Sequence, residues 1–149
     1  MKIGITASAF DVLHAGHVSM LEEARSHCDF LICALHIDPT IDRPQKEKPV
    51  QTIVERYTQL RAVEFVDEII PYQTESDLLD ILQLRKIDVR IIGEEYKDVV
   101  FTGRHLCEKL GIKIIYNLRS HRFSSTLKRK AMAEGRKNDA ATIQDDSNG

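Results

Sequence analysis

The chain has 149 residues, of which 42% are hydrophobic and 30% are charged, and its formal net charge is -2. This length is enough for one domain with one core, and too short for two typical domains. A net charge this close to zero argues against a nucleic-acid-binding protein, and no apolar run approaches the roughly 20 residues that span a bilayer. Because the N-terminus enters the first predicted strand without a signal sequence, we expect a cytoplasmic protein.

Five short apolar runs alternate with helical patterns along the chain. The runs cover residues 3–7, 30–35, 68–72, 89–92 and 112–116. Apolar runs of this length, when they alternate with helices, are typical of strands in a parallel sheet that is covered on both faces. The sequence therefore predicts an α/β fold.

The turn after the first predicted strand places two imidazoles, His14 and His17, three residues apart. Apolar residues then recur at helical spacing, which predicts a helix that begins near Gly16. The first turn of a helix has unpaired backbone N–H groups and the positive end of the helix dipole, and Gly16 lets an anion approach closely. Both imidazoles face one side and can donate hydrogen bonds to phosphate oxygens, so we predict a phosphate site here.

Two alternative roles for the histidine pair stay open. Each histidine could simply cap and pack the end of the helix. A zinc site is the second alternative, but it requires three or four protein ligands, and no third ligand is evident nearby. His27 and Cys28 cannot supply one, because they fall at the far end of the same helix, about 15 Å away. We expect no metal site built from protein ligands alone.

The loop after the second strand, residues 38–49, contains three prolines and several charges. A loop this long is unusual in an α/β connection and indicates a lid, with Lys46 and Lys48 able to close over a triphosphate. A solvated surface loop is the alternative. The helix signals that follow are Thr52 with Glu55, Thr74 with Asp77, and a helix stop at Gly111.

The candidate segments all follow predicted strands. They are residues 8–17, 36–49, 93–97 and 119–125. In an open parallel sheet, ligands bind beyond the carboxyl ends of the strands, so these segments converge on one site. The chain has neither a G-x-G-x-x-G motif after the first strand nor a P-loop, which excludes the common dehydrogenase and P-loop kinase classes.

The segment of residues 6–17 resembles the HxGH signature of the small cytidylyltransferase-like nucleotidyltransferases. Residues 65–71, 93–97 and 119–126 fall in the order that this family uses, and the last resembles its second signature, usually RTxGIST. The resemblance covers most of residues 1–130 and implies a Rossmann-like parallel five-stranded sheet of the HxGH nucleotidyltransferase type. There are two departures: Ser8 and Ala9 replace Gly followed by Thr or Cys, and Arg122 and Phe123 replace Gly-Ile.

The resemblance also implies roles for residues. The expected catalytic residues are His14, His17, Lys46 and Arg119. The expected nucleotide-binding residues are Ala9, Phe10, Gly16, Lys48, Gly93, Glu94, Ser120, Ser124 and Ser125. Ala9 has lost a side-chain donor, which leaves its backbone N–H for the phosphate.

We expect Mg²⁺ to arrive with the triphosphate, because it prefers phosphate and water ligands to an all-protein cage. Asp11 has two open roles, orienting the ion or a histidine, and capping the helix. Glu94 and Glu95 are secondary candidates for contacts with nucleotide or acceptor hydroxyls. No strong general base is required, because an attacking phosphate monoester is already largely dianionic near pH 7.

The expected reaction is transfer of CMP from CTP to a small phosphorylated polyol, glycerol 3-phosphate, with release of pyrophosphate. Residues 65–71 and the short chain favour this cytidylyltransferase branch. The alternative is an adenylyltransferase that acts on a sugar phosphate such as heptose 1-phosphate, since residues 93–97 resemble that branch. A non-catalytic nucleotide-binding module is a second alternative, favoured by Ala9 and Arg122. Analogy with related enzymes indicates a homodimer, although no helical pattern isolates its interface.

The domain boundary is expected near residue 133. Residues 1–133 form the predicted nucleotidyltransferase domain, and the polar residues 134–149 form a predicted disordered tail. Cys28, Cys33 and Cys107 fall in predicted helices or strands and are interpreted as buried thiols of a reducing compartment, without a chemical role.

Overall fold

The computed structural model describes residues 1–118, and they form a five-stranded parallel sheet with the strand order β3-β2-β1-β4-β5. The strands are β1 (Ile3–Ser8), β2 (Phe30–His36), β3 (Glu68–Tyr72), β4 (Val89–Gly93) and β5 (Lys113–Asn117). Each strand bound lies within one residue of the predicted bound, and the predicted α/β fold is confirmed. One detail of the prediction is wrong: His36 is the last residue of β2, whereas the prediction places it after the strand, in the candidate segment of residues 36–49.

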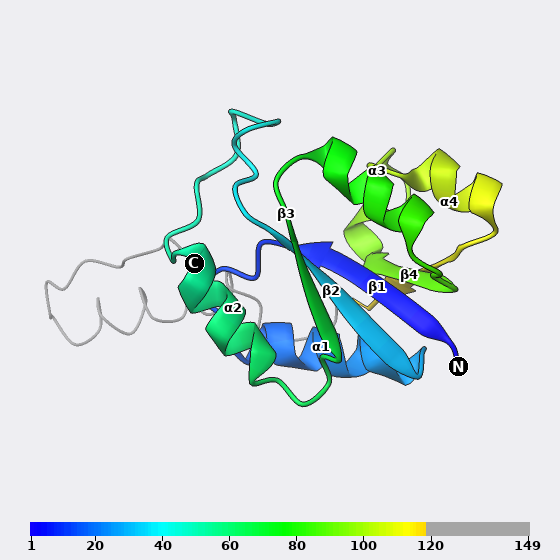
Figure 1. The fold of residues 1–149 in the computed structure, drawn as a ribbon, viewed down its shortest axis with the longest axis horizontal. Helices are drawn as coiled ribbons and strands as arrows, with labels where there is room; N and C mark the ends of the chain where they lie inside the picture. The colour runs from blue at the N-terminus through cyan, green and yellow to red at the C-terminus, as the bar shows by residue number, and fades with distance from the viewer. Residues whose placement is uncertain (119–149) are drawn as a thin grey trace, which may run out of the picture.

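Helices cover both faces of the sheet, as predicted (Figure 1). One face packs against α1 (Ala15–Ser26) and α2 (Ile53–Arg61), and the other against α3 (Glu75–Leu84) and α4 (Arg104–Leu110). The core is accordingly divided in two. Phe10, Leu21 and Leu60 belong to the cluster on the α1 and α2 side, and Leu78 and Leu82 belong to the cluster on the α3 and α4 side.

The helix ends follow the predicted signals. The Thr52 hydroxyl accepts a hydrogen bond from the Glu55 N–H at 3.1 Å, and Glu55 Oε1 accepts one from the Thr52 N–H at 3.0 Å. Thr74 and Asp77 cap α3 with the same reciprocal arrangement. Gly111 ends α4 with a φ of 75°, in the left-handed region that glycine adopts at low cost.

The carboxyl ends of the strands form the edge of the sheet where the candidate segments gather. The chain winds from β1 through β2 to β3 on one side and then crosses over to β4 on the other side of β1. The strand order reverses at β1, and ligands of open α/β sheets bind at such a point. The loop from β2 to α2, residues 37–52, projects beyond this edge (Figure 1, cyan). A single-turn 3-10 helix, η1 (Glu94–Tyr96), follows β4 directly.

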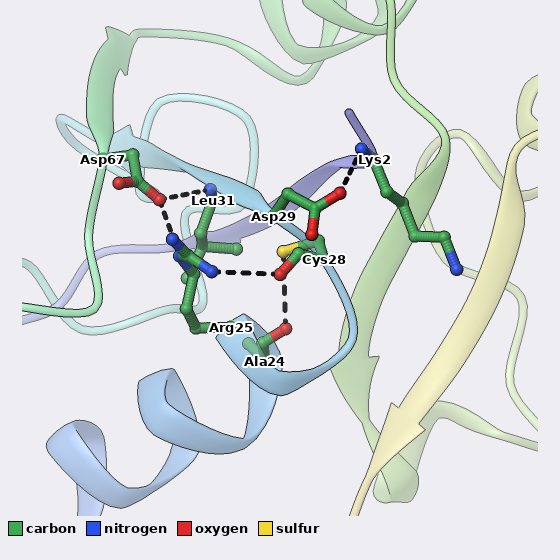
Figure 2. A network of polar contacts seen from close by, with 7 residues as sticks. All are labelled: Lys2, Ala24, Arg25, Cys28, Asp29, Leu31 and Asp67. Atoms are coloured by element: carbon green, nitrogen blue, oxygen red, sulfur yellow. Dashed lines mark hydrogen bonds and ion pairs between the residues drawn. The ribbon is translucent and has the colours of Figure 1, made fainter.

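The opposite end of α1 is fixed by a network of polar contacts (Figure 2). Arg25 Nε donates to Asp67 Oδ2 at 2.8 Å, and Arg25 Nη1 donates to the Cys28 carbonyl at 3.1 Å. Asp67 Oδ2 also accepts from the Leu31 N–H at 2.8 Å, which ties the segment before β3 to the start of β2. This network holds the C-terminal end of α1 and thereby orients its N-terminal end toward the candidate site.

Cys28, Cys33 and Cys107 are free and buried, as predicted, and burial raises the pKa of each thiol. Among residues 1–118, no helix has the length and apolar character needed to cross a bilayer. The predicted tail, residues 134–149, and the predicted site residues Arg119, Ser120, Ser124 and Ser125 lie outside the described residues.

Candidate active site

The two histidines of the first turn form a capping box for α1. His14 is the N-cap residue, and its Nδ1 accepts a hydrogen bond from the Gly16 N–H at 2.9 Å. His17 is the third helical residue, and its Nδ1 accepts one from the His14 N–H at 3.2 Å. The ring centroids are 4.2 Å apart, so the two imidazoles lie side by side at the start of the helix.

These hydrogen bonds determine where each imidazole carries its proton. A ring nitrogen that accepts from an N–H group has no proton of its own, so the neutral ring carries its proton on Nε2. Both histidines are therefore Nε2–H donors, the form that can bind a phosphate oxygen. The capping role and the phosphate-binding role are thus compatible, because they use different nitrogens of the same ring.

The prediction of open backbone N–H groups in the first turn is wrong for Gly16. Its N–H donates to His14 Nδ1 and is not available to a ligand. The capping box also engages the N–H of His17. The Nε2–H groups of the imidazoles therefore replace backbone donors at this helix end.

His17 is electrically neutral at physiological pH. Burial, reinforced by the neighbouring His14, lowers the pKa of His17 from 6.5 to about 4, although Asp11 acts in the opposite direction. A neutral donor beside a helix N-terminus costs less to bury than a cation and still stabilises negative charge when a triphosphate arrives.

The depressed pKa of His17 predicts a dependence of stability on pH. Between pH 6.5 and 4 the unfolded chain binds a proton at His17 that the folded chain excludes, so the free energy of unfolding falls as pH drops through that range. The loss at pH 4 amounts to up to about 3 kcal/mol. Urea unfolding at several pH values should show it, and the variant His17→Gln should flatten the curve over this range. Identical pH curves for both proteins would contradict it.

The loop between β1 and α1 is strained and tightly held. Phe10 and Val12 each have a φ of 49°, which is unusual for residues other than glycine, and Phe10 is anchored in the core at 2% exposure. The Asp11 carboxylate accepts hydrogen bonds from the N–H groups of Val50 and Gln51 at 2.8 and 3.0 Å. Asp11 therefore does not cap the helix; it joins this loop to the end of the 37–52 loop.

Arg56 of α2 holds the ends of β1 and β2 together, and no pattern in the sequence indicated it. The residue is 3% exposed, and its guanidinium donates to four carbonyls, those of Ala9, His36, Ile37 and Gln51, at 2.6 to 3.2 Å. Burial lowers the pKa of Arg56, and Asp11 and Asp38 partly compensate for this effect. The arginine fixes the floor of the site without facing a ligand.

Two cavities lined by residues of the 1–118 range open at this edge of the sheet. The larger, about 470 Å³, lies beneath the 37–52 loop, between the strand ends, the start of α3 and the segment before α4. Ala9 and Lys46 line it, together with His36, Tyr72 and Arg90. The smaller cavity, about 280 Å³, lies between the ends of β1, β4 and β5 and the side of α1. Its lining includes Phe10, Met20, Gly93, Glu95 and Asn117.

The remaining predicted residues are distributed unevenly around these cavities. Lys46 is exposed at the rim of the larger cavity. Lys48 has a side chain that is 77% exposed, and its Nζ lies 3.7 Å from Asp38 Oδ2. Glu94 is exposed and is absent from the described lining of the smaller cavity, whereas its neighbour Glu95 lines that cavity. Lys48 is likewise absent from the described lining of both cavities.

Gly93 matters for the position of Glu95. A Cβ atom added at Gly93 would lie 1.5 Å from Glu95 Oε1, so only glycine allows the carboxylate its present place. Within residues 1–118 no group of three or more His, Cys, Asp or Glu side chains could hold a metal ion.

The parallel strand order and the imidazole pair at the first strand–helix turn define a Rossmann-like domain of the nucleotidyltransferase type. The family model described as "Cytidylyltransferase-like" matches residues 5–131, and the chain belongs to this family.

Curated relatives include the "Bifunctional protein HldE" of Hyphomonas neptunium, which is 33% identical over 116 residues, 77% of this chain and 24% of that protein. The HldE protein of Campylobacter jejuni is 33% identical over 110 residues, 73% of this chain and 24% of that protein. The chain thus spans about a quarter of the length of these relatives.

Solved structures share the fold. A lipopolysaccharide core biosynthesis protein from Thermoplasma volcanium has a TM-score of 0.64 at 24% identity, over 81% of this chain and 98% of that one. A pantoate-beta-alanine ligase from Francisella tularensis has a TM-score of 0.59 at 20% identity, over 99% of this chain and 74% of that one.

Proposed function

We propose that the chain transfers a nucleoside monophosphate from a nucleoside triphosphate to a phosphorylated sugar and releases pyrophosphate, with ATP as the favoured nucleotide. The observation that carries this proposal is the imidazole pair. Two Nε2–H donors, 4.2 Å apart between ring centroids, stand at the positive end of α1 where a triphosphate gains the most stabilisation.

The chemistry suits the groups that the chain provides. A phosphate oxygen of the acceptor attacks the α-phosphorus, a new P–O bond forms, and the bond to the pyrophosphate oxygen breaks. The attacking phosphate is already largely dianionic near pH 7, so its deprotonation needs little help. The difficult part is to bring two anions together in line and to neutralise the charge that moves onto pyrophosphate. His14, His17 and Lys46 would supply donors and charge for that task.

The nucleotide would lie against the smaller cavity, next to the start of α1. Gly93 and Glu95 would face its sugar, and the phosphates would meet the imidazoles. The other nucleotide contacts remain proposals carried over from the family signatures: the Ala9 N–H, Phe10, Lys48, Glu94, Ser120, Ser124 and Ser125, with Arg119 as a further cation. Gly16 would contribute by letting the ligand approach closely, since its N–H is engaged in the cap. Mg²⁺ would be held by the phosphates and water, since this ion needs no dedicated protein cage.

The acceptor would occupy the larger cavity. A volume of about 470 Å³ is within the usual range for small-molecule sites and is roomy for a three-carbon acceptor. The HldE proteins among the relatives, together with the resemblance of residues 93–97, favour ATP and a sugar phosphate. CTP with glycerol 3-phosphate is the second candidate, because residues 65–71 resemble the cytidylyltransferase branch. A cytoplasmic location and a homodimer stay predictions.

A matrix of substrates tests this proposal. Pyrophosphate release would be measured with ATP or CTP against mannose 1-phosphate, glycerol 3-phosphate and other phosphorylated polyols. We expect release with ATP and a sugar phosphate, and little with either substrate alone. Release only with CTP and glycerol 3-phosphate would favour the second candidate. Nucleotide binding without product from any acceptor would instead support a non-catalytic module.

A further inference from the structure

The larger cavity contains a stacked aromatic pair that the proposed mechanism does not use. His36 ends β2 and Tyr72 ends the neighbouring β3, where the two residues are register partners. Their ring centroids are 4.4 Å apart with an interplanar angle of 18°, so the rings are stacked. Both residues line the cavity, and they are 6% and 5% exposed.

The imidazole of His36 has one satisfied and one unsatisfied nitrogen. Its hydrogen bond is with the backbone of Gln73, and this bond favours the protonated ring, so the ring donates to the Gln73 carbonyl. Nε2 is buried and has no hydrogen-bond partner among the described residues, so the donor is Nδ1–H. In the neutral ring, Nε2 then carries a lone pair and no proton.

The surroundings favour the neutral form of this ring. Burial is the main cause that lowers the pKa of His36, and Arg43 adds to it. Glu75, the Gln73 bond and Asp42 act in the opposite direction without reversing the shift. A buried lone pair without a donor is an unfavourable arrangement in the free protein, and a ligand that brings an O–H or N–H group removes the deficit.

The rest of the cavity indicates what such a ligand also carries. Arg90, at 5% exposure, lies in the wall with its guanidinium over the Phe101 ring and a hydrogen bond to the Thr102 carbonyl. Arg43 pairs with Glu75 at 3.1 Å, and Lys46 stands at the rim. The same lining also contains the carboxylates of Glu47 and Glu75. Cations together with several acceptors, the Nε2 lone pair among them, suit a molecule with both an anionic group and hydroxyls.

We propose that His36 is a specificity-determining residue: its Nε2 accepts a hydrogen bond from a hydroxyl of the phosphorylated acceptor and selects polyhydroxylated acceptors over plain alkyl phosphates. This inference rests on the proposed function and deepens it. The phosphate itself is not the partner of Nε2, because a phosphate oxygen and an unprotonated ring nitrogen are both acceptors.

The test compares two acceptors of similar size, mannose 1-phosphate and cyclohexyl phosphate, which lacks every ring hydroxyl. Calorimetric binding and the KM for each acceptor would be measured for the wild type and for His36→Phe, which keeps a ring to stack on Tyr72 and lacks the nitrogen. The variant His36→Gln offers an amide oxygen as a substitute acceptor. His105→Phe, the same change at an exposed position of α4, is the matched control.

We expect His36→Phe to bind mannose 1-phosphate about tenfold more weakly and cyclohexyl phosphate with unchanged affinity, as the loss of one hydrogen bond implies. His36→Gln should recover part of the difference, and His105→Phe should behave as the wild type. An equal effect of His36→Phe on both acceptors, or none on either, would overturn the inference. Because binding is measured directly, a wild type that discriminates between the acceptors but releases no pyrophosphate would refute the proposed function and leave the role of His36 standing.

Discussion

The variant His17→Gln is expected to fold normally and to lower kcat of nucleotidyl transfer by about 10²–10³-fold, the usual effect of removing one donor to developing charge. Glutamine is an ordinary residue at the third position of a capping box, so its side chain can still accept from the His14 N–H. The change therefore leaves the helix start intact and removes the imidazole, so that the only side-chain donor left at this position is an amide N–H group placed differently toward the phosphate. The KM for the triphosphate should change less than kcat, because the charge to be stabilised is greatest in the transition state.

His14→Asn provides the companion measurement. Asparagine is a preferred N-cap residue and can replace His14 Nδ1 as the acceptor for the Gly16 N–H. We expect a fall in kcat similar to that of His17→Gln with little change in the free energy of unfolding, whereas His105→Gln should leave both unchanged. A kcat close to that of the wild type in both cap-preserving variants would show that the histidines only cap the helix.

The largest effect on stability is expected for Arg56→Met. This substitution leaves four carbonyls at the ends of β1, β2 and the 37–52 loop without their common donor. Buried carbonyls without partners and lost hydrogen bonds to a charged group together predict a decrease of about 3–5 kcal/mol in the free energy of unfolding. Lysine is a poor replacement, since one ammonium group cannot reproduce a planar fork of donors.

Urea unfolding monitored by circular dichroism measures this effect, with Arg61→Met as the control. Arg61 lies in the last turn of the same helix and is exposed, so its loss should cost only about 0.5 kcal/mol. Equal destabilisation by the two substitutions would contradict the role assigned to Arg56.

The sheet could be predicted because its strands are short apolar runs whose bounds are set by composition. The helix starts at Thr52 and Thr74 were also predictable, since the hydroxyl and the carboxylate of a capping box lie three residues apart in the sequence. Capping by His14 and His17 was only one open alternative, because capping boxes ordinarily use Ser or Thr with Glu or Gln. Only the three-dimensional structure shows that each ring uses Nδ1 for the cap.

The site residues that could not be predicted are polar side chains whose partners are remote. Arg56 bonds to carbonyls up to 47 positions away, which no local pattern reveals. His36 and Arg90 carried a usable signal, namely a polar residue at the end of, or inside, an apolar run. Lys48 and Glu94 lie outside the α-helices and the strands of the sheet, where no repeating pattern in the sequence tells which way a side chain points. The choice between Glu94 and Glu95 could therefore not be made from the sequence.

A crystal structure of the full chain with α,β-methylene-ATP would show whether the histidine pair binds the triphosphate, because this analogue cannot be cleaved at the reacting bond. We expect triphosphate oxygens about 3 Å from Nε2 of both His14 and His17, at the start of α1. A triphosphate bound elsewhere, with both Nε2 atoms out of hydrogen-bond reach of its oxygens, would contradict the proposed site.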